Sequence, residues 1–233
     1  VAVTARGHEV DWSLRPTGGE ANIDSLLEAA AIRAGQPPNV VCLDLPLSRD
    51  PIVARRAADQ QISQAYGSRL CSAHSPTAGR PGPLGDRLHK SLARHGYRLI
   101  TANDDPVDSG VLLEVYPHPA IVELLSLERR LEYKVSKSNR FWPQASVAER
   151  RRMLLENLQR LHDGLSSWLG RLPLDLPPHE QVGKLSELKR YEDALDAVVC
   201  CWVGVRYLAR SAKAFGGDRD AIWCPVAPGS EPV

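Results

Sequence analysis

Three acidic residues lie close together on one helix that the sequence predicts near the C-terminal end of the chain. Apolar residues recur at helical spacing between Ser186 and Arg210, and the same segment carries Glu192, Asp193 and Asp196. Spacings of three and four residues place Asp196 beside both other acids. Carboxylates in this arrangement repel one another unless they are solvated or share a cation, and oxygen ligands without Cys or His suit Mg²⁺ or Mn²⁺. The cluster therefore indicates either a solvated helix face or part of a metal site.

Two further acids follow short apolar runs that are typical of buried strands. The run Val40–Leu43 ends at Asp44, and the run Val111–Leu113 ends at Glu114. Short runs without alternating polar residues are expected where a strand is covered on both faces. We predict that the two strands are neighbours, that the acidic helix packs across them, and that the acids converge closely enough to share a cation.

The rest of the chain alternates between strands and helices, which is typical of a mixed α/β fold. The runs Val1–Thr4 and Val10–Leu14 predict a hairpin, and a helical pattern that ends at Gly35 follows it. Residues 48–108 include a long Gly- and Pro-rich stretch, so we predict an insertion of helices and a loop beside the sheet. The predicted helices within it cover Arg49–Ala65 and Leu84–His95.

Composition limits the classes of protein to which the chain belongs. Its 233 residues are 43% hydrophobic and 24% charged, which suits one globular domain over residues 1–233. A net charge of +1 gives no global attraction to nucleic acid or to an anionic membrane. No run of about 18 apolar residues and no charged-then-apolar leader is present, so we expect a cytoplasmic protein without a membrane span. Five cysteines without a CxxC pair argue against a disulfide framework and against a zinc site.

One segment, Arg129–Arg152, is strongly basic. It holds eight basic residues against two acids, a local charge of +6, and Tyr133, Phe141 and Trp142 lie among them. Basic side chains attract a phosphate backbone and aromatic rings stack on bases, so nucleic acid or a nucleotide is a possible partner. The alternative is a solvated helix face whose aromatic rings point inward.

Six short segments, in this order along the chain, together resemble one known family. They are residues 41–47 (VCLDLPL), 56–59 (RAAD), 114–119 (EVYPHP), 133–134 (YK), 192–197 (EDALDA) and 222–225 (IWCP). The order is similar to that of the predicted nucleases of the RNase H-like fold that are known as domain of unknown function 429. The resemblance implies a five-stranded mixed sheet flanked by helices, with carboxylates gathered at the sheet edge around divalent metal for phosphodiester cleavage.

The resemblance also implies roles for particular residues. Asp44, Glu114, Asp193 and Asp196 would be the metal ligands and catalytic residues of a Mg²⁺ or Mn²⁺ site, which can hold two ions in such enzymes. The sequence leaves open whether Glu192 or its neighbour faces outward.

Three further residues carry weaker signals. Lys134 resembles the family's Tyr-Lys pair and would neutralise a substrate phosphate, the alternative being a surface lysine. Arg56 would hold a phosphate or form pairs within its own helix. His118 would assist proton transfer, although a lone His is more often structural.

One feature of the RNase H-like pattern is not found in this sequence. Such enzymes usually carry an essential Asp in a strand ahead of the hairpin, and Asp11 does not replace it. We expect either that this strand lies upstream of Val1 or that one metal ligand has been lost.

Three functions remain open on the sequence alone. The first is a metal-dependent nuclease or phosphodiesterase, and the second is a non-catalytic module of the same fold that binds a nucleotide or nucleic acid. The third is an actin-like phosphotransferase, which the absence of a Gly-rich phosphate loop beside a strand makes least favoured.

Overall fold

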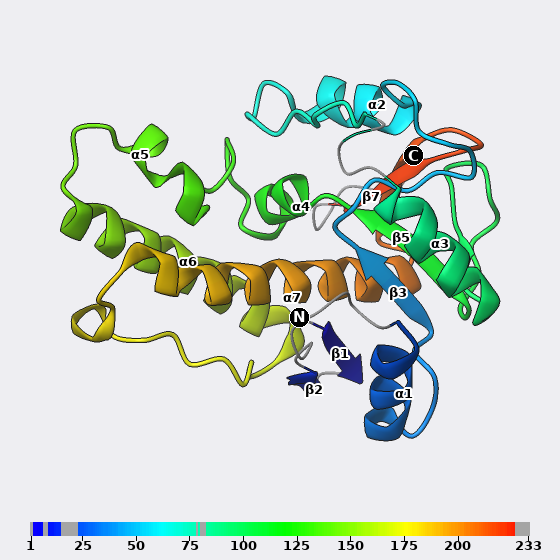
Figure 1. Cartoon of the computed structure of the whole chain (residues 1–233), viewed down its shortest axis with the longest axis horizontal. Coiled ribbons are helices and arrows are strands. Elements are labelled where there is room, and N and C mark those ends of the chain that lie inside the picture. The colour runs from blue at the N-terminus through cyan, green and yellow to red at the C-terminus, as the bar shows by residue number, and fades with distance from the viewer. Residues whose placement is uncertain (1, 7–8, 15–22, 78, 80–82, 227–233) are drawn as a thin grey trace.

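A five-stranded mixed sheet forms the centre of the protein, whose computed structural model describes residues 2–6, 9–14, 23–77, 79 and 83–226. The strand order is β3 (Val40–Leu43), β5 (Val111–Val115), β7 (Ala221–Pro225) and β6 (Ala212–Gly216), and β4 (Arg98–Leu99) also pairs with β5. Strands β3, β4 and β7 run parallel to β5, whereas β6 is antiparallel to β7. Figure 1 shows β3 and β5 side by side.

The two adjoining strands β3 and β5 contain the short apolar runs Val40–Leu43 and Val111–Leu113. All five residues of β5 are buried, and β3 pairs with β5 so that Leu43 lies opposite Glu114. The carboxyl ends of β3 and β5 therefore meet at one edge of the sheet, where Asp44 follows β3 directly.

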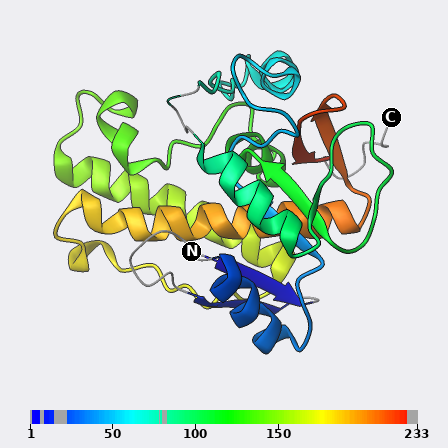
Figure 2. The same cartoon turned by 45° about the vertical axis from the view of Figure 1, so that its right-hand side comes forward.

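Helices α4 (Pro117–Leu124), α6 (Val147–Leu169) and α7 (Lys189–Leu208) cover one face of the sheet. Figures 1 and 2 show α6 and α7 packed alongside each other. Ser146 and Glu149 form a capping box at the start of α6, which fixes where that helix begins. Val111, Leu113 and Val115 of β5 pack in the core on this face.

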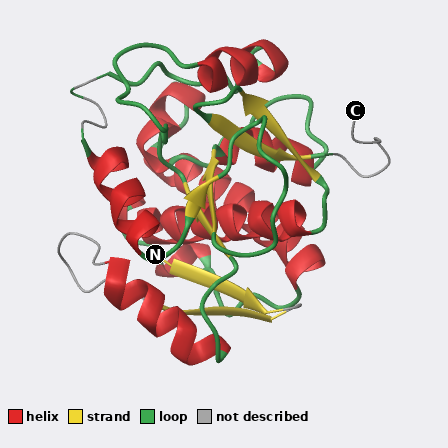
Figure 3. Cartoon of the chain, turned by 90° about the vertical axis from the view of Figure 1, so that its right-hand side faces the viewer, coloured by secondary structure: helices red, strands yellow, loops and turns green. Residues whose placement is uncertain are grey.

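The opposite face carries α1 (Ile23–Ala34), α2 (Ala57–Tyr66) and α3 (Leu84–Arg94). Leu112 of β5 packs there with Leu92 of α3, while Ile62 of α2 packs on Ile222 of β7. Figure 3 shows helices on both sides of the strands. Because side chains alternate along a strand, Glu114 shares the face of Leu112.

The remaining elements are short or lie apart from the central sheet. Strands β1 (Ala2–Arg6) and β2 (Glu9–Leu14) form an antiparallel hairpin of their own, and β1 packs near α7 and α1. Helix α5 (Ser138–Phe141) and three 3-10 helices complete the described structure, the latter over Val135–Lys137, His179–Gln181 and Leu185–Leu188.

Most of the predicted elements are confirmed, including the hairpin, the pairing of β3 with β5 and the packing of α7 across them. Val1, assigned to the first predicted strand, lies outside the described residues, as does any strand ahead of it. The helix predicted over Arg49–Ala65 begins only at Ala57, where the Asp59 carboxylate accepts a hydrogen bond from the backbone N–H of the preceding residue, Arg56. Residues 48–108 contribute to the sheet itself, since β4 pairs with β5.

Candidate metal centre

The first two turns of α7 bring three acidic side chains together. One oxygen from each of Glu192, Asp193 and Asp196 lies within 4.8 Å of the others. Glu192 and Asp196 are buried, whereas Asp193 is exposed. Of Glu192 and Asp193, which the sequence could not distinguish, Asp193 is therefore the one that faces outward. The cluster of three acids is compatible with a metal site.

Asp196 is held by the Tyr133–Lys134 pair from the segment that follows α4. The Tyr133 hydroxyl donates a hydrogen bond to Asp196 Oδ1 over 2.5 Å, and the Lys134 ammonium donates to Oδ2. Burial raises the pKa of Asp196, while Lys134 and Tyr133 act in the opposite direction. Lys134 also lies 3.5 Å from Glu192 Oε1, so its charge is shared between the two buried acids.

The other two acids of the cluster, Glu192 and Asp193, have partners of their own. Lys189 Nζ lies 2.8 Å from Glu192 Oε1 and also forms an ion pair with Asp193. The backbone N–H of Val135 donates to Glu192 Oε2 over 2.8 Å. Each helix acid therefore has a lysine partner, which explains how three like charges share two helical turns.

Asp44 directly follows β3 and lines a common groove with Asp193 and Asp196. It is not one of the three acids whose carboxylate oxygens lie within 4.8 Å of one another. Its side chain is exposed, but surrounding protein atoms and the charge of Asp196 raise its pKa to about 6, against the opposing effects of Lys134 and Lys189. Among the described residues, no cation forms an ion pair with Asp44. A carboxylate that faces another carboxylate without a direct partner provides a position where a cation would be stabilised.

A groove leads to these acids from one side. It has a volume of about 480 Å³ and runs between α1, β3 and α7, with apolar lining along most of its length. Asp44, Asp193 and Asp196 line one end of it. The acids are therefore accessible to a small ligand or to an ion.

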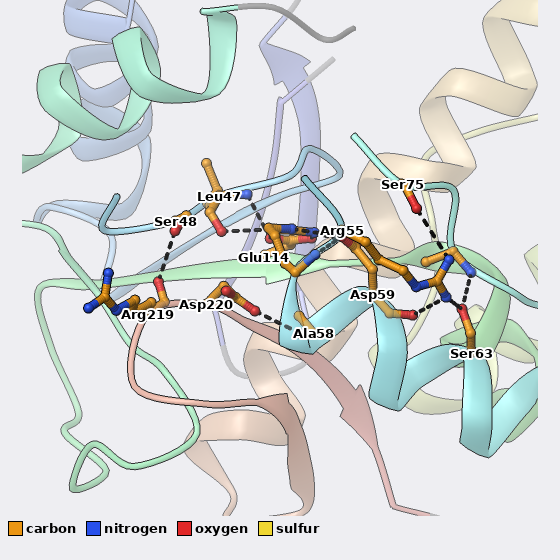
Figure 4. Close-up of polar contacts among 12 residues, drawn as sticks. Leu47, Ser48, Arg55, Ala58, Asp59, Ser63, Ser75, Glu114, Arg219 and Asp220 are labelled. Atoms are coloured by element: carbon orange, nitrogen blue, oxygen red, sulfur yellow. Dashed lines mark hydrogen bonds and ion pairs between the residues drawn. The ribbon is translucent and has the colours of Figure 1, made fainter. Parts of the chain in front are cut away.

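Glu114 does not join the acids of α7. It points to the other face of the sheet, where both carboxylate oxygens accept hydrogen bonds from Arg56, over 2.6 and 2.7 Å. The backbone N–H of Leu47 donates to the same carboxylate over 2.7 Å, and Figure 4 shows Glu114 with Leu47 and Asp59. Burial raises the pKa of Glu114 to about 7, against the effect of Arg56. Its role as a metal ligand stays a prediction that this arrangement does not favour.

The guanidinium of Arg56 is likewise fully hydrogen-bonded to other residues of the protein. Its five N–H groups donate twice to Asp59, twice to Glu114 and once to the carbonyl oxygen of Leu47. The side chain is buried, and no donor remains for a substrate phosphate. Of the two interpretations that the sequence allowed for Arg56, the pair with Asp59 is the one observed, although Arg56 itself lies just ahead of α2.

Sequence reasoning missed Lys189, although a signal for it was present. Lys189 precedes Glu192 by three residues and Asp193 by four, the spacings at which opposite charges pair on a helix. The same spacing rule that identified the acidic cluster would have identified its counter-ion.

Comparison with known proteins gives one match. The profile of a family described as Protein of unknown function (DUF429) matches residues 4–221. The chain belongs to the DUF429 family. No curated protein and no solved structure matches it significantly. The part of this DUF429 chain that matches includes Asp44, Glu114 and all three acids of α7.

No helix in the described part of this DUF429 chain is a candidate membrane span. None of its helices there combines the length and the apolar character that crossing a bilayer requires.

Proposed function

We propose that this DUF429 protein is a metal-dependent phosphodiester hydrolase, a nuclease of RNase H-like type that uses Mg²⁺ or Mn²⁺. The observation that carries the proposal is that Asp44 lines the same groove as Asp193 and Asp196, while no cation among the described residues forms an ion pair with it. The proposal is supported by the cluster of Glu192, Asp193 and Asp196 on α7. Two of these acids, Asp193 and Asp196, line the same groove as Asp44.

The donor set fits a hard divalent cation. Carboxylate oxygens are the ligands that Mg²⁺ and Mn²⁺ prefer, and no thiol or imidazole is in the group. Four carboxylates and the two lysines, Lys134 and Lys189, leave two negative charges uncompensated. That balance suits one divalent cation, and a second would rely on the charge of a substrate phosphate.

Four residues of the site, Asp44, Asp196, Tyr133 and Lys134, would each have a role in hydrolysis. A bound cation would activate water and stabilise the charge that develops on the phosphoryl oxygens. Asp44 and Asp196 would hold it, while Tyr133 fixes the orientation of the Asp196 carboxylate. Lys134 lies beside Asp196 and supplies a positive charge for a phosphoryl oxygen.

A second candidate function is a non-catalytic binding module. The observation that favours it is that Glu192, Asp193 and Asp196 each already pair with a lysine. In that case the lysines satisfy the acids permanently, and the function depends on the basic segment Arg129–Arg152.

The two candidates differ in their response to metal and to one substitution. We expect cleavage of a phosphodiester substrate with Mg²⁺ or Mn²⁺, none with EDTA, and loss of orders of magnitude in rate in Asp44→Asn. Asp105→Asn is the matched control, because Asp105 is exposed and has no ion-pair partner among the described residues. Full activity in Asp44→Asn, or activity that a chelator does not reduce, would favour the binding module instead.

A further inference from the structure

Six of the eight basic residues of Arg129–Arg152 fall into two groups in the structure. Those at the start of α6 are engaged there: Arg150 donates to Asn139 and Arg151 to backbone carbonyls at Val182 and Gly183. Arg152 lies 3.8 Å from Glu156 on the exposed side of α6. None of these contacts involves the acids at the end of the sheet.

The second group lies around His118. Arg130, Lys134 and Lys137 are the charged side chains that act on the His118 ring. Lys134 is paired with Asp196, but no carboxylate pairs with Arg130 or Lys137 among the described residues. Burial and the charges of Arg130, Lys134 and Arg140 lower the pKa of Lys137, against the effect of Glu192. These neighbouring cations make the environment of Lys137 locally positive.

His118 is a buried polar side chain within this group. It is only 6% exposed, and its Nδ1 atom has no hydrogen-bond partner among the residues that the structure describes. The ring lies edge-on to Tyr116 at 5.6 Å and to Tyr133 at 5.7 Å, measured between ring centroids. Burial and the neighbouring cations lower its pKa to about 3, so the ring is neutral at pH 7.

The backbone adds to the positive potential. His118 is the second residue of α4, and the N-terminus of a helix carries a partial positive charge from its aligned peptide dipoles. Pro117 and Pro119 have no backbone N–H group, so His118 supplies the backbone hydrogen-bond donor among the first three residues of α4. A ligand with negative charge would be stabilised at this position by the dipole and by the side-chain cations together.

The basic group is joined to the candidate metal centre through adjacent residues. The Tyr133 ring contacts His118, while its hydroxyl donates to Asp196. An anion beside His118 would therefore lie next to the carboxylates. Aromatic surface is present as well, because the Arg130 guanidinium lies 5.6 Å from the centroid of the Phe141 ring, which in turn contacts Trp142.

We propose that Arg130, Lys137 and His118 form a subsite for a phosphate of a single-stranded oligonucleotide, next to the phosphodiester that is cleaved. Phe141 and Trp142 offer surfaces on which a neighbouring base stacks. The link to cleavage rests on the proposed function, whereas the binding of the phosphate does not require the metal.

The test is the binding of a fluorescein-labelled oligothymidylate in EDTA, followed by anisotropy at several salt concentrations. We expect Arg130→Gln and Lys137→Gln each to weaken binding roughly tenfold and to reduce the salt slope by about 0.7, the value for one contact to a single strand. The matched control is Arg152→Gln, which removes an equal charge from the same segment and should bind as the unaltered protein does. Circular dichroism checks that each variant is folded. If Arg130→Gln does not fold, Lys137→Gln still tests the proposal.

The outcomes separate this proposal from the proposed function. Absence of oligonucleotide binding, unchanged binding in both variants, or equal weakening in Arg152→Gln would overturn the subsite. Binding that depends on Arg130 and Lys137 in a protein that shows neither Mn²⁺ binding nor cleavage would support the subsite and overturn the hydrolase.

Discussion

Arg56, just ahead of α2, holds both carboxylate oxygens of Glu114, which lies 58 residues further along the chain on β5. This pair lies on the face of the sheet opposite to the acids of α7. It connects the segment 48–108 to the central strand and completes a buried charge network with Asp59.

Glu114→Gln tests whether Glu114 serves the fold. Because Arg56 would keep its buried charge with one carboxylate fewer, we expect a loss of about 2 to 4 kcal/mol in the free energy of unfolding. Urea denaturation measures it. Glu156→Gln is the matched control: its pair with Arg152 is exposed, so the change should stay within about 0.5 kcal/mol.

The same variant separates fold from metal binding. Folded Glu114→Gln should bind Mn²⁺ with unchanged affinity, because its carboxylate faces away from Asp44 and the helix acids. A large loss of Mn²⁺ affinity without a loss of stability would show that Glu114 is a ligand after all.

The sequence predicted the central strands but not the face on which each acid lies. Apolar runs identified β3 and β5, and helical spacing identified α7. Because a run that is buried on both faces shows no polar alternation, nothing in Val111–Leu113 indicated that Glu114 points away from α7. Side-chain direction depends on the pairing register, here Leu43 opposite Glu114, which only the folded sheet defines.

Two strands were missed for local reasons. β4 is only the two residues Arg98–Leu99, too short to show a pattern. β6, Ala212–Gly216, has the sequence AKAFG and contains no β-branched residue. Both strands are specified by their neighbours β5 and β7 more than by their own side chains.

Lys134→Gln should increase the affinity for Mn²⁺ at pH 8. The Lys134 ammonium neutralises Asp196 and lies near Glu192, so its removal leaves more negative charge for a cation. We expect roughly tenfold tighter binding by calorimetry, a modest value for the loss of one nearby charge. Lys90→Gln, at an exposed lysine of α3, should leave the affinity unchanged. Weaker binding in Lys134→Gln would contradict the charge balance proposed for the site.

Mn²⁺ affinity should fall as the pH is lowered through about 6. Desolvation by the surrounding protein and the charge of Asp196 raise the pKa of Asp44 to about 6, and a proton on that carboxylate competes with the cation. Calorimetric titrations between pH 5 and 8, a range chosen to bracket that value, would show the fall. In Asp44→Asn the residual Mn²⁺ affinity should not fall near pH 6. A fall of the same size in that variant would show that another group titrates.

Gly204→Ala tests the close contact between α7 and β3. A Cβ atom at Gly204 would lie 2.9 Å from Cys42 Sγ and 3.5 Å from Val40 Cγ1. We expect a net destabilisation of about 1 to 2 kcal/mol, since overpacking outweighs the gain in helix propensity. Gly217→Ala is the matched control, because its nearest atom, Ala57 Cβ, is 4.0 Å away. A stabilised Gly204→Ala protein would show that α7 does not approach β3 this closely.

The most direct measurement is the anomalous diffraction of Mn²⁺ in crystals of the protein grown at pH 8. We expect an anomalous peak between Asp44 and Asp196, with Asp193 or Glu192 as a further ligand, and no peak at Glu114. Diffraction from Asp44→Asn crystals in the same solution should show the peak lost or much reduced. A peak at Glu114, or none among the acids at millimolar Mn²⁺, would contradict the proposed metal centre.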